Sequence, residues 1–177
     1  MSKNDDFCRP EVFEGGRSVR FGEFTLLDLF GTWREMVRQY GSLASSQLKE
    51  MYAKVFDDRL LKFGTKNRER METIARDFYR NYPYRLRELL AGMAETSGLD
   101  FEKHLLLNAV QVIVADELWG NPPATAQSFH CTGIAVWGEY SAGPLIYGRN
   151  YDYQDCLKEL GKNLIVAVYH PCDGSLA

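Results

Sequence analysis

A cysteine, an arginine and an aspartate in the last third of the chain have the types and spacing from which covalent chemistry could be built. Cys131 opens a β-prone run, and Arg149 and Asp152 follow the end of a second such run. The polar, Gly- and Pro-containing segment between the runs, residues 139–144, predicts a turn. Because the start of one hairpin strand lies beside the end of the next, we expect a thiol, a guanidinium and a carboxylate to meet at one sheet edge.

This stretch resembles a known superfamily. Residues 131–133 (Cys-Thr-Gly) followed by residues 148–152 (Gly-Arg-Asn-Tyr-Asp) are similar to the start of the mature chain in N-terminal nucleophile (Ntn) cysteine hydrolases of the choloylglycine hydrolase type. Residues 90–100 and 105–109 resemble the pre-peptide of the related isopenicillin N acyltransferase family, and residues 14–22 are a weaker match. The specific part of the resemblance is the stretch from the cysteine to the aspartate.

The resemblance implies a protein that cuts its own chain between His130 and Cys131, so that Cys131 becomes an N-terminal nucleophile. A cysteine thiol and a chain-terminal amine ordinarily have pKa values of about 8.5 and about 8, so the new amine can take the thiol proton near neutral pH. The implied function is an autoprocessing amide hydrolase or acyltransferase. It would act without a cofactor on the non-peptide C–N bond of a small N-acylated amine.

The neighbouring polar residues take their expected roles from the same resemblance. Arg149 is similar to the family's arginine beside the cysteine, which can hold the thiolate or orient a substrate oxygen. Asp152 is similar to the aspartate that hydrogen-bonds the new α-amine. His130 departs from the glycine that is more usual before the nucleophile in the acyltransferase relatives. Without the resemblance, Cys131 would be interpreted as a small buried strand residue, and Arg149 with Asp152 as a surface ion pair.

The chain before this stretch is helical in pattern. Apolar residues at three- and four-residue intervals predict a helix from Thr25 that stops at Gly41. Further helices are predicted from Ser45 or Ser46 and over residues 67–82, 84–96 and 101–118. Strands are predicted over residues 131–138, 144–149 and 163–170, with a possible short strand at 18–21.

These elements predict an α+β fold, and the resemblance implies the first strands of an αββα Ntn-hydrolase sandwich. The expected division is an irregular arm over 1–23, a helical pro-segment over 24–118, a linker over 119–130 and the start of the sheet domain over 131–177. Because the sandwich needs more strands than follow Cys131, we expect the chain to be incomplete. The family's asparagine oxyanion donors and its further arginine would then lie beyond residue 177.

Composition bounds the partners. The 177 residues are 45% hydrophobic and 25% charged, enough for one domain with a core, and the net charge of −3 argues against a nucleic-acid or membrane partner. No apolar run is long enough to span a bilayer. The N-terminus lacks the apolar core of a signal peptide, which predicts a cytoplasmic protein, although a secreted chain with its signal removed would look the same. The four cysteines suit neither a disulfide scaffold nor a metal site.

Two alternatives stay open. Residues 24–118 could be a helical binding or assembly module beside a catalytically inactive hydrolase sheet. The basic and aromatic residues of 59–90 could also suggest RNA binding, but solvated helix faces with i,i+4 ion pairs explain them better.

His104 and His170 have no partner pattern in the sequence and are interpreted as structural. For an enzyme, the expected partners are a small acyl amide and either a C-terminal half that completes the sandwich or further copies of the chain.

Overall fold

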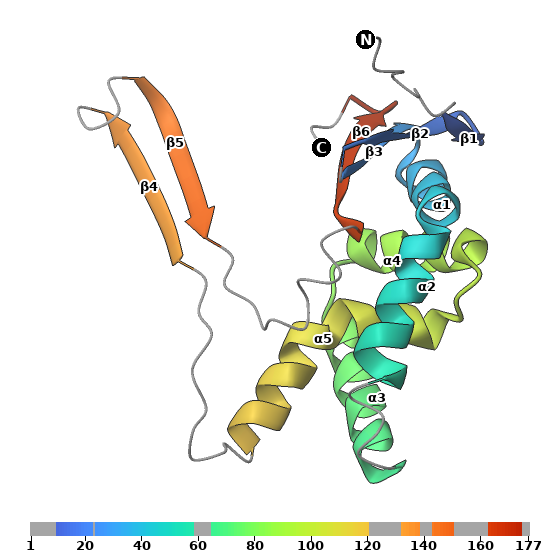
Figure 1. Ribbon diagram of the computed structural model, residues 1–177, viewed down its shortest axis with the longest axis vertical. Helices are drawn as coiled ribbons and strands as arrows, with labels where there is room; N and C mark the ends of the chain where they lie inside the picture. Colours follow the sequence, from blue (N-terminus) through green and yellow to red (C-terminus); the bar gives the residue numbers. More distant parts are fainter. Residues whose placement is uncertain are drawn as a thin grey trace, which may run out of the picture.

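The computed structural model describes residues 10–22, 24–58, 65–120, 132–138, 143–150 and 163–174. Within these residues the protein is a mixed α+β structure (Figure 1). Five α-helices pack with a four-stranded mixed sheet, and two further strands form a separate hairpin. The α+β class predicted from the sequence is therefore confirmed.

The four-stranded sheet combines both ends of the chain. Its strands are β1 (Glu11–Phe13), β2 (Gly16–Phe21), β3 (Phe24–Gly31) and β6 (Ile165–Pro171), in the order β1-β2-β3-β6. The first two pairings are antiparallel, whereas β3 and β6 run parallel. The irregular arm predicted over residues 1–23 is thus wrong for the residues of β1 and β2, and the possible short strand at 18–21 lies within β2. Glu14 and Gly15 have φ of 46° and 89°, the left-handed backbone that a tight hairpin turn requires.

The helix predicted from Thr25 to Gly41 is wrong in its first part, because residues 24–31 form β3, and confirmed from Trp33 onward. In this strand Thr25, Leu27 and Leu29 are buried against the helices, whereas Phe24 and Leu26 are exposed on the opposite face. A run that is apolar on both faces matches the helical period as well as the strand period, so its sequence does not distinguish them. Pairing with β6, far along the chain, decides for the strand.

The first helix, α1 (Trp33–Leu43), begins only after the strand. Thr32 is its N-cap and forms a capping box with Glu35, which satisfies two backbone N–H groups at the start of the helix. The sequence predicts that the helix ends at Gly41, but α1 continues past this residue to Leu43. A Cβ atom at Gly41 would lie 2.6 Å from Oγ1 of Thr96 and would collide with the carbonyl oxygen of Met93. Glycine is needed here because α1 crosses the fourth helix closely.

The four later helices follow the predicted pattern closely. They are α2 (Ser45–Tyr52), which continues into a π-helical turn η1 (Ala53–Asp57), then α3 (Thr65–Arg80), α4 (Tyr84–Ser97) and α5 (Phe101–Gly120). Pro83 precedes α4, and Gly98, with φ of 72°, closes it in the left-handed conformation.

One core joins the inner face of the sheet to the helices. Leu27 and Leu29 of β3 are fully buried with Met36 of α1, and Phe56 and Ile113 extend the same cluster among the helices. Side chains from β6 pack on this cluster too, namely Ile165, Ala167 and Tyr169. The sheet and its core therefore cross the division that the sequence had suggested at residues 119–130.

The hairpin consists of β4 (Thr132–Gly138) and β5 (Gly143–Asn150), paired antiparallel. Both predicted strands are confirmed, and so is the third, which is β6. The register of the hairpin shifts between Val136 and Gly138, where Gly138 has φ of 61°. Such a shift is a β-bulge or a similar irregularity of the strand pairing.

Candidate functional site

The backbone register of the hairpin bears directly on the predicted site. Thr132 lies opposite Asn150, and Gly133 lies opposite Arg149. The residue that follows Cys131 in the sequence therefore pairs with a residue two positions before Asp152. In an antiparallel pair, directly opposed residues have Cα atoms about 4.5–5.5 Å apart. The antiparallel pair of strands on which the predicted site depends is present.

The site residues themselves are only partly described. Cys131, His130 and Asp152 lie outside the described residues, and Arg149 is described through its backbone position alone. The meeting of the thiol, the guanidinium and the carboxylate stays a prediction. Its geometric basis is the pairing of Gly133 with Arg149.

A second polar group, which the sequence did not reveal, lies on the outer face of the four-stranded sheet. Nε2 of His170 on β6 donates to Oδ1 of Asp28 on β3 at 2.7 Å, and Nη2 of Arg17 on β2 lies 3.7 Å from Oδ2 of the same carboxylate. The His170 ring also stacks on Phe30 with 4.4 Å between ring centroids. We call Arg17, Asp28 and His170 the outer-face polar cluster. It ties three neighbouring strands together.

The helix predicted from Thr25 does not indicate this cluster, because only a strand at these residues places Asp28 beside β6. In the parallel register Asp28 lies opposite Val168 and Phe30 lies opposite His170, so Asp28 and His170 are diagonal neighbours on one face. The alternation of Phe24, Leu26, Asp28 and Phe30 in the sequence is the signal that could have indicated it.

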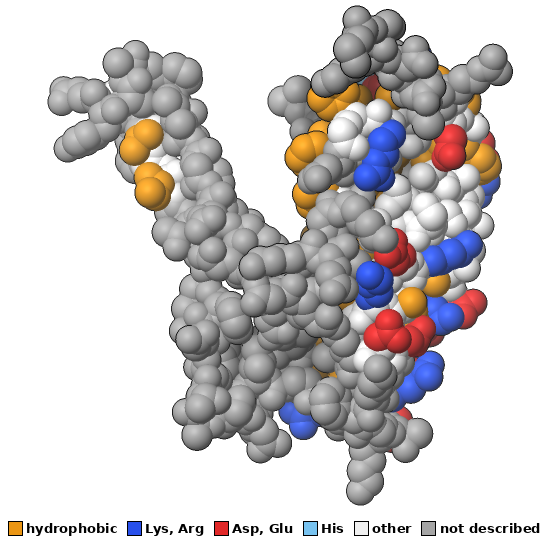
Figure 2. Space-filling view, in the orientation of Figure 1, with side chains coloured by type: hydrophobic (Ala, Val, Ile, Leu, Met, Phe, Trp, Pro, Cys, Tyr) orange, Lys and Arg blue, Asp and Glu red, His pale blue; other side chains and the backbone are white. Residues whose placement is uncertain are grey.

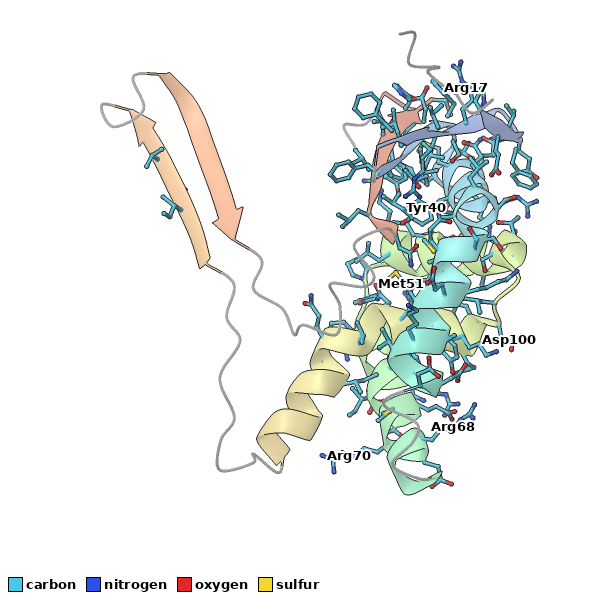
Figure 3. All side chains as sticks on the ribbon, in the orientation of Figure 1. Arg17, Tyr40, Met51, Arg68, Arg70 and Asp100 are labelled. Carbon is cyan, nitrogen blue, oxygen red and sulfur yellow. The ribbon has the colours of Figure 1, made fainter. Side chains whose placement is uncertain are left out.

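The opposite side of the sheet is buried against the helices. Tyr40 of α1 lies beneath the sheet, whereas Arg17 lies on the outer side (Figure 3). Burial raises the pKa of Tyr40 to about 12 and also raises the pKa of Tyr169 on the inner face of β6. The two faces of the sheet are thus different environments, because helices cover the inner face and the outer face is exposed.

His104 occupies a buried hydrogen-bonded position that agrees with its structural interpretation. Its Nε2 lies 2.6 Å from Oγ of Ser97, which also accepts a hydrogen bond of 3.1 Å from the backbone N–H of Leu99. Both side chains are almost completely buried, and burial lowers the pKa of His104, which favours the neutral ring. This buried serine–histidine pair links α4 to α5.

A chain of ion pairs fixes α1 to its neighbours. Arg38 binds Glu14 of the β1–β2 turn at 2.7 Å and also binds Glu95 of α4, while Arg34 pairs with Glu88 at 3.2 Å and with Glu95. The hydrogen bonds from Arg38 lower the pKa of Glu14 and of Glu95. This network is structural, because each carboxylate is already paired with arginine.

Within the described ranges, His, Cys, Asp and Glu residues do not gather in any group that could hold a metal ion. The helices of the described part are each too short or too polar to cross a membrane. Comparison of the chain with protein-family models, curated proteins and solved structures found no match.

Proposed function

We propose that this protein is an autoprocessing cysteine amide hydrolase or acyltransferase of the Ntn type. The observation that supports the proposal most directly is the antiparallel pairing of Thr132 with Asn150. This pairing gives the chain segments next to Cys131 and Asp152 a common end of one hairpin. The proposal is therefore supported by the pairing of the two strands as well as by the sequence of the Cys-Thr-Gly and Gly-Arg-Asn-x-Asp segments.

In the proposed processing step, Sγ of Cys131 attacks the carbonyl carbon of His130. The C–N bond breaks, the nitrogen becomes the free α-amine of Cys131, and water hydrolyses the thioester that remains. In the following reaction this amine takes the thiol proton, and the thiolate attacks the carbonyl of a small N-acylated amine. The substrate amine leaves with a proton, and water or a second amine then takes the acyl group from sulfur.

The roles of the neighbouring residues follow from their charges. The guanidinium of Arg149 favours the thiolate over the thiol and can hold the oxygen of the attacked carbonyl. The carboxylate of Asp152 accepts a hydrogen bond from the α-amine and keeps it oriented toward sulfur. No cofactor takes part in these steps.

The architecture around the site supports the proposal in a coarser way. Helices cover the inner face of the four-stranded sheet and leave its outer face open, which is the arrangement of one half of an αββα sandwich. The finer assignment to the Ntn sandwich belongs to the proposal.

The test is the intact mass of the full chain after incubation near neutral pH. The natural protein should yield a new chain that starts at Cys131, whereas Cys131→Ala should stay whole. Cys172→Ala is the matched control, because Cys172 is an exposed free thiol in the turn after β6. It should be processed like the natural protein. If the natural protein and Cys131→Ala both stay whole, self-processing is wrong.

Thiol labelling provides a second measurement that does not depend on cleavage. A cysteine held beside a guanidinium should react faster than an ordinary exposed thiol near neutral pH. Cys131 should therefore be modified ahead of Cys172. Equal rates would favour the non-catalytic helical assembly protein instead.

A further inference from the structure

The outer face of the four-stranded sheet carries an exposed apolar group beside the outer-face polar cluster. Exposed sheets in water normally carry polar side chains on the solvated face. Here the outward positions are hydrophobic toward one end of the strands, at Phe21, Phe24, Leu26, Val166 and Val168. Figure 2 shows hydrophobic side chains gathered on the part of the body that the sheet forms.

The register makes these side chains one continuous surface. Phe21 lies opposite Phe24 across β2 and β3, and Leu26 lies opposite Val166 across β3 and β6. Directly opposed residues in neighbouring strands share a face. We call this surface, without the polar cluster, the apolar outer face.

The β4–β5 hairpin needs an apolar surface to pack on, and the four-stranded sheet exposes one. A two-stranded hairpin is at best marginally stable in water and needs a further apolar surface to pack on. Ile134 is 65% exposed, and the register places Val136 opposite Ile146. Neither strand of the hairpin pairs with the four-stranded sheet. Within the described residues, the hairpin and the apolar outer face are thus two apolar surfaces that each need cover.

We propose that the apolar outer face is the docking surface of the β4–β5 hairpin of the same chain. The hairpin packs on it face to face as a second β layer, at the separation of about 10 Å usual for stacked sheets. The docking rests on the proposed function in one respect: a docked hairpin would hold the end next to Cys131 against the body. The packing of the hairpin on the sheet is inferred from the exposed apolar side chains alone.

Chain connectivity favours this occupant over a second copy. Residues 121–131 join α5 to β4, and residues 151–164 join β5 to β6, which itself supplies Val166 and Val168 to the surface. Because β6 is itself part of the surface, the chain that leaves β5 leads back to it. A tethered segment has an effective concentration in the millimolar range, above the concentration of any second copy in a dilute solution.

The outer-face polar cluster indicates where the hairpin stops. Burying an ion pair under apolar side chains is rarely favourable. The hairpin should therefore cover the part of the sheet that includes Val166 and Val168. Asp28 and His170 then lie at the rim of the covered area, where water reaches them.

Hydrogen exchange of the full Cys131→Ala chain tests the proposal, and this variant removes any contribution from processing. The hairpin amides of residues 132–150 should be protected in the parent. Val168→Lys should reduce their protection about tenfold or more, because it places a charge in the docking surface. The matched control is Val112→Lys on α5, since Val112 and Val168 have nearly equal exposed fractions, 38% and 40%. The control should leave hairpin protection unchanged.

Protection of α1 and α4 reports whether each variant is folded. If Val168→Lys fails to fold, Val166→Lys replaces it with the same expectation. Unprotected hairpin amides in the parent would overturn the proposal, as would equal effects of the Val168→Lys and Val112→Lys substitutions. A dimer that Val168→Lys dissociates without changing hairpin protection would assign the surface to a second copy and also overturn it. Docking with no processing of the natural chain would contradict only the proposed function.

Discussion

His170 and Asp28 are 142 positions apart in the sequence, yet the imidazole and the carboxylate are joined by a hydrogen bond of 2.7 Å. The bond connects the last strand of the sheet to a strand near the N-terminus. Backbone hydrogen bonds flank it on both sides, from Thr25 to Leu164 and from Cys172 to Gly31, each 2.9 Å long. The parallel β3–β6 pairing is therefore supported by side chains on one face and by backbone along its length.

Removing this side-chain pair should weaken the sheet only slightly. Asp28→Asn loses the charge that His170 and Arg17 share, and we expect a decrease of about 1 kcal/mol or less in the free energy of unfolding, because both partners are half-exposed. Denaturant unfolding measures it. Asp77→Asn, which removes an exposed i,i+3 pair with Arg80, is the control and should have a smaller effect. A loss of several kcal/mol would mean that the pair is buried under another layer.

Stability should fall in acid through the carboxylates bound to Arg38. The pKa values of Glu14 and Glu95 are lowered in the folded protein, first by the hydrogen bonds from Arg38. A lowered folded-state pKa stabilises the protein above the ordinary carboxyl pKa, and this contribution is lost as the pH falls through the folded-state value. Unfolding free energies measured from pH 7 down to pH 3 should show this decline.

Arg38→Gln should flatten that part of the pH profile and lower stability mainly near neutral pH. Arg80→Gln, which removes an exposed ion pair within α3, is the matched control and should keep the slope of the parent. A profile unchanged by Arg38→Gln would show that other carboxylates carry the acid sensitivity.

If the chain is cut between His130 and Cys131, the two pieces should stay together. Residues 25–31 pair with residues 165–171 along the whole of β6, and Ile165, Ala167 and Tyr169 pack on the core formed by the earlier residues. Native mass spectrometry should therefore give the sum of both pieces, and denaturing conditions should separate them.

Ala167→Asp should release the C-terminal piece, because it places an unpaired carboxylate against the core. Val168→Thr, one position along and on the outer face, should not release it. Free pieces from the unsubstituted protein under native conditions would contradict the prediction.

Elements with strong local signals could be predicted from the sequence. Pro83 and Gly98 mark the ends of α4, the three- and four-residue spacing of apolar residues marks α3 and α5, and a Gly- and Pro-containing turn marks the β4–β5 hairpin. These signals depend on a few neighbouring residues, so no distant contact is needed to interpret them.

The remaining features depended on tertiary structure. The run from Phe24 to Gly31 is apolar on both faces and suits a helix or a strand, and only pairing with β6 selects the strand. The same pairing brings His170 to Asp28 and joins the C-terminal strand to the helical body. Gly41 looked like a helix stop, yet it lies within α1 where α4 approaches too closely for a side chain. In each case the decisive partner lies far along the chain, so the local pattern of residues could not reveal it.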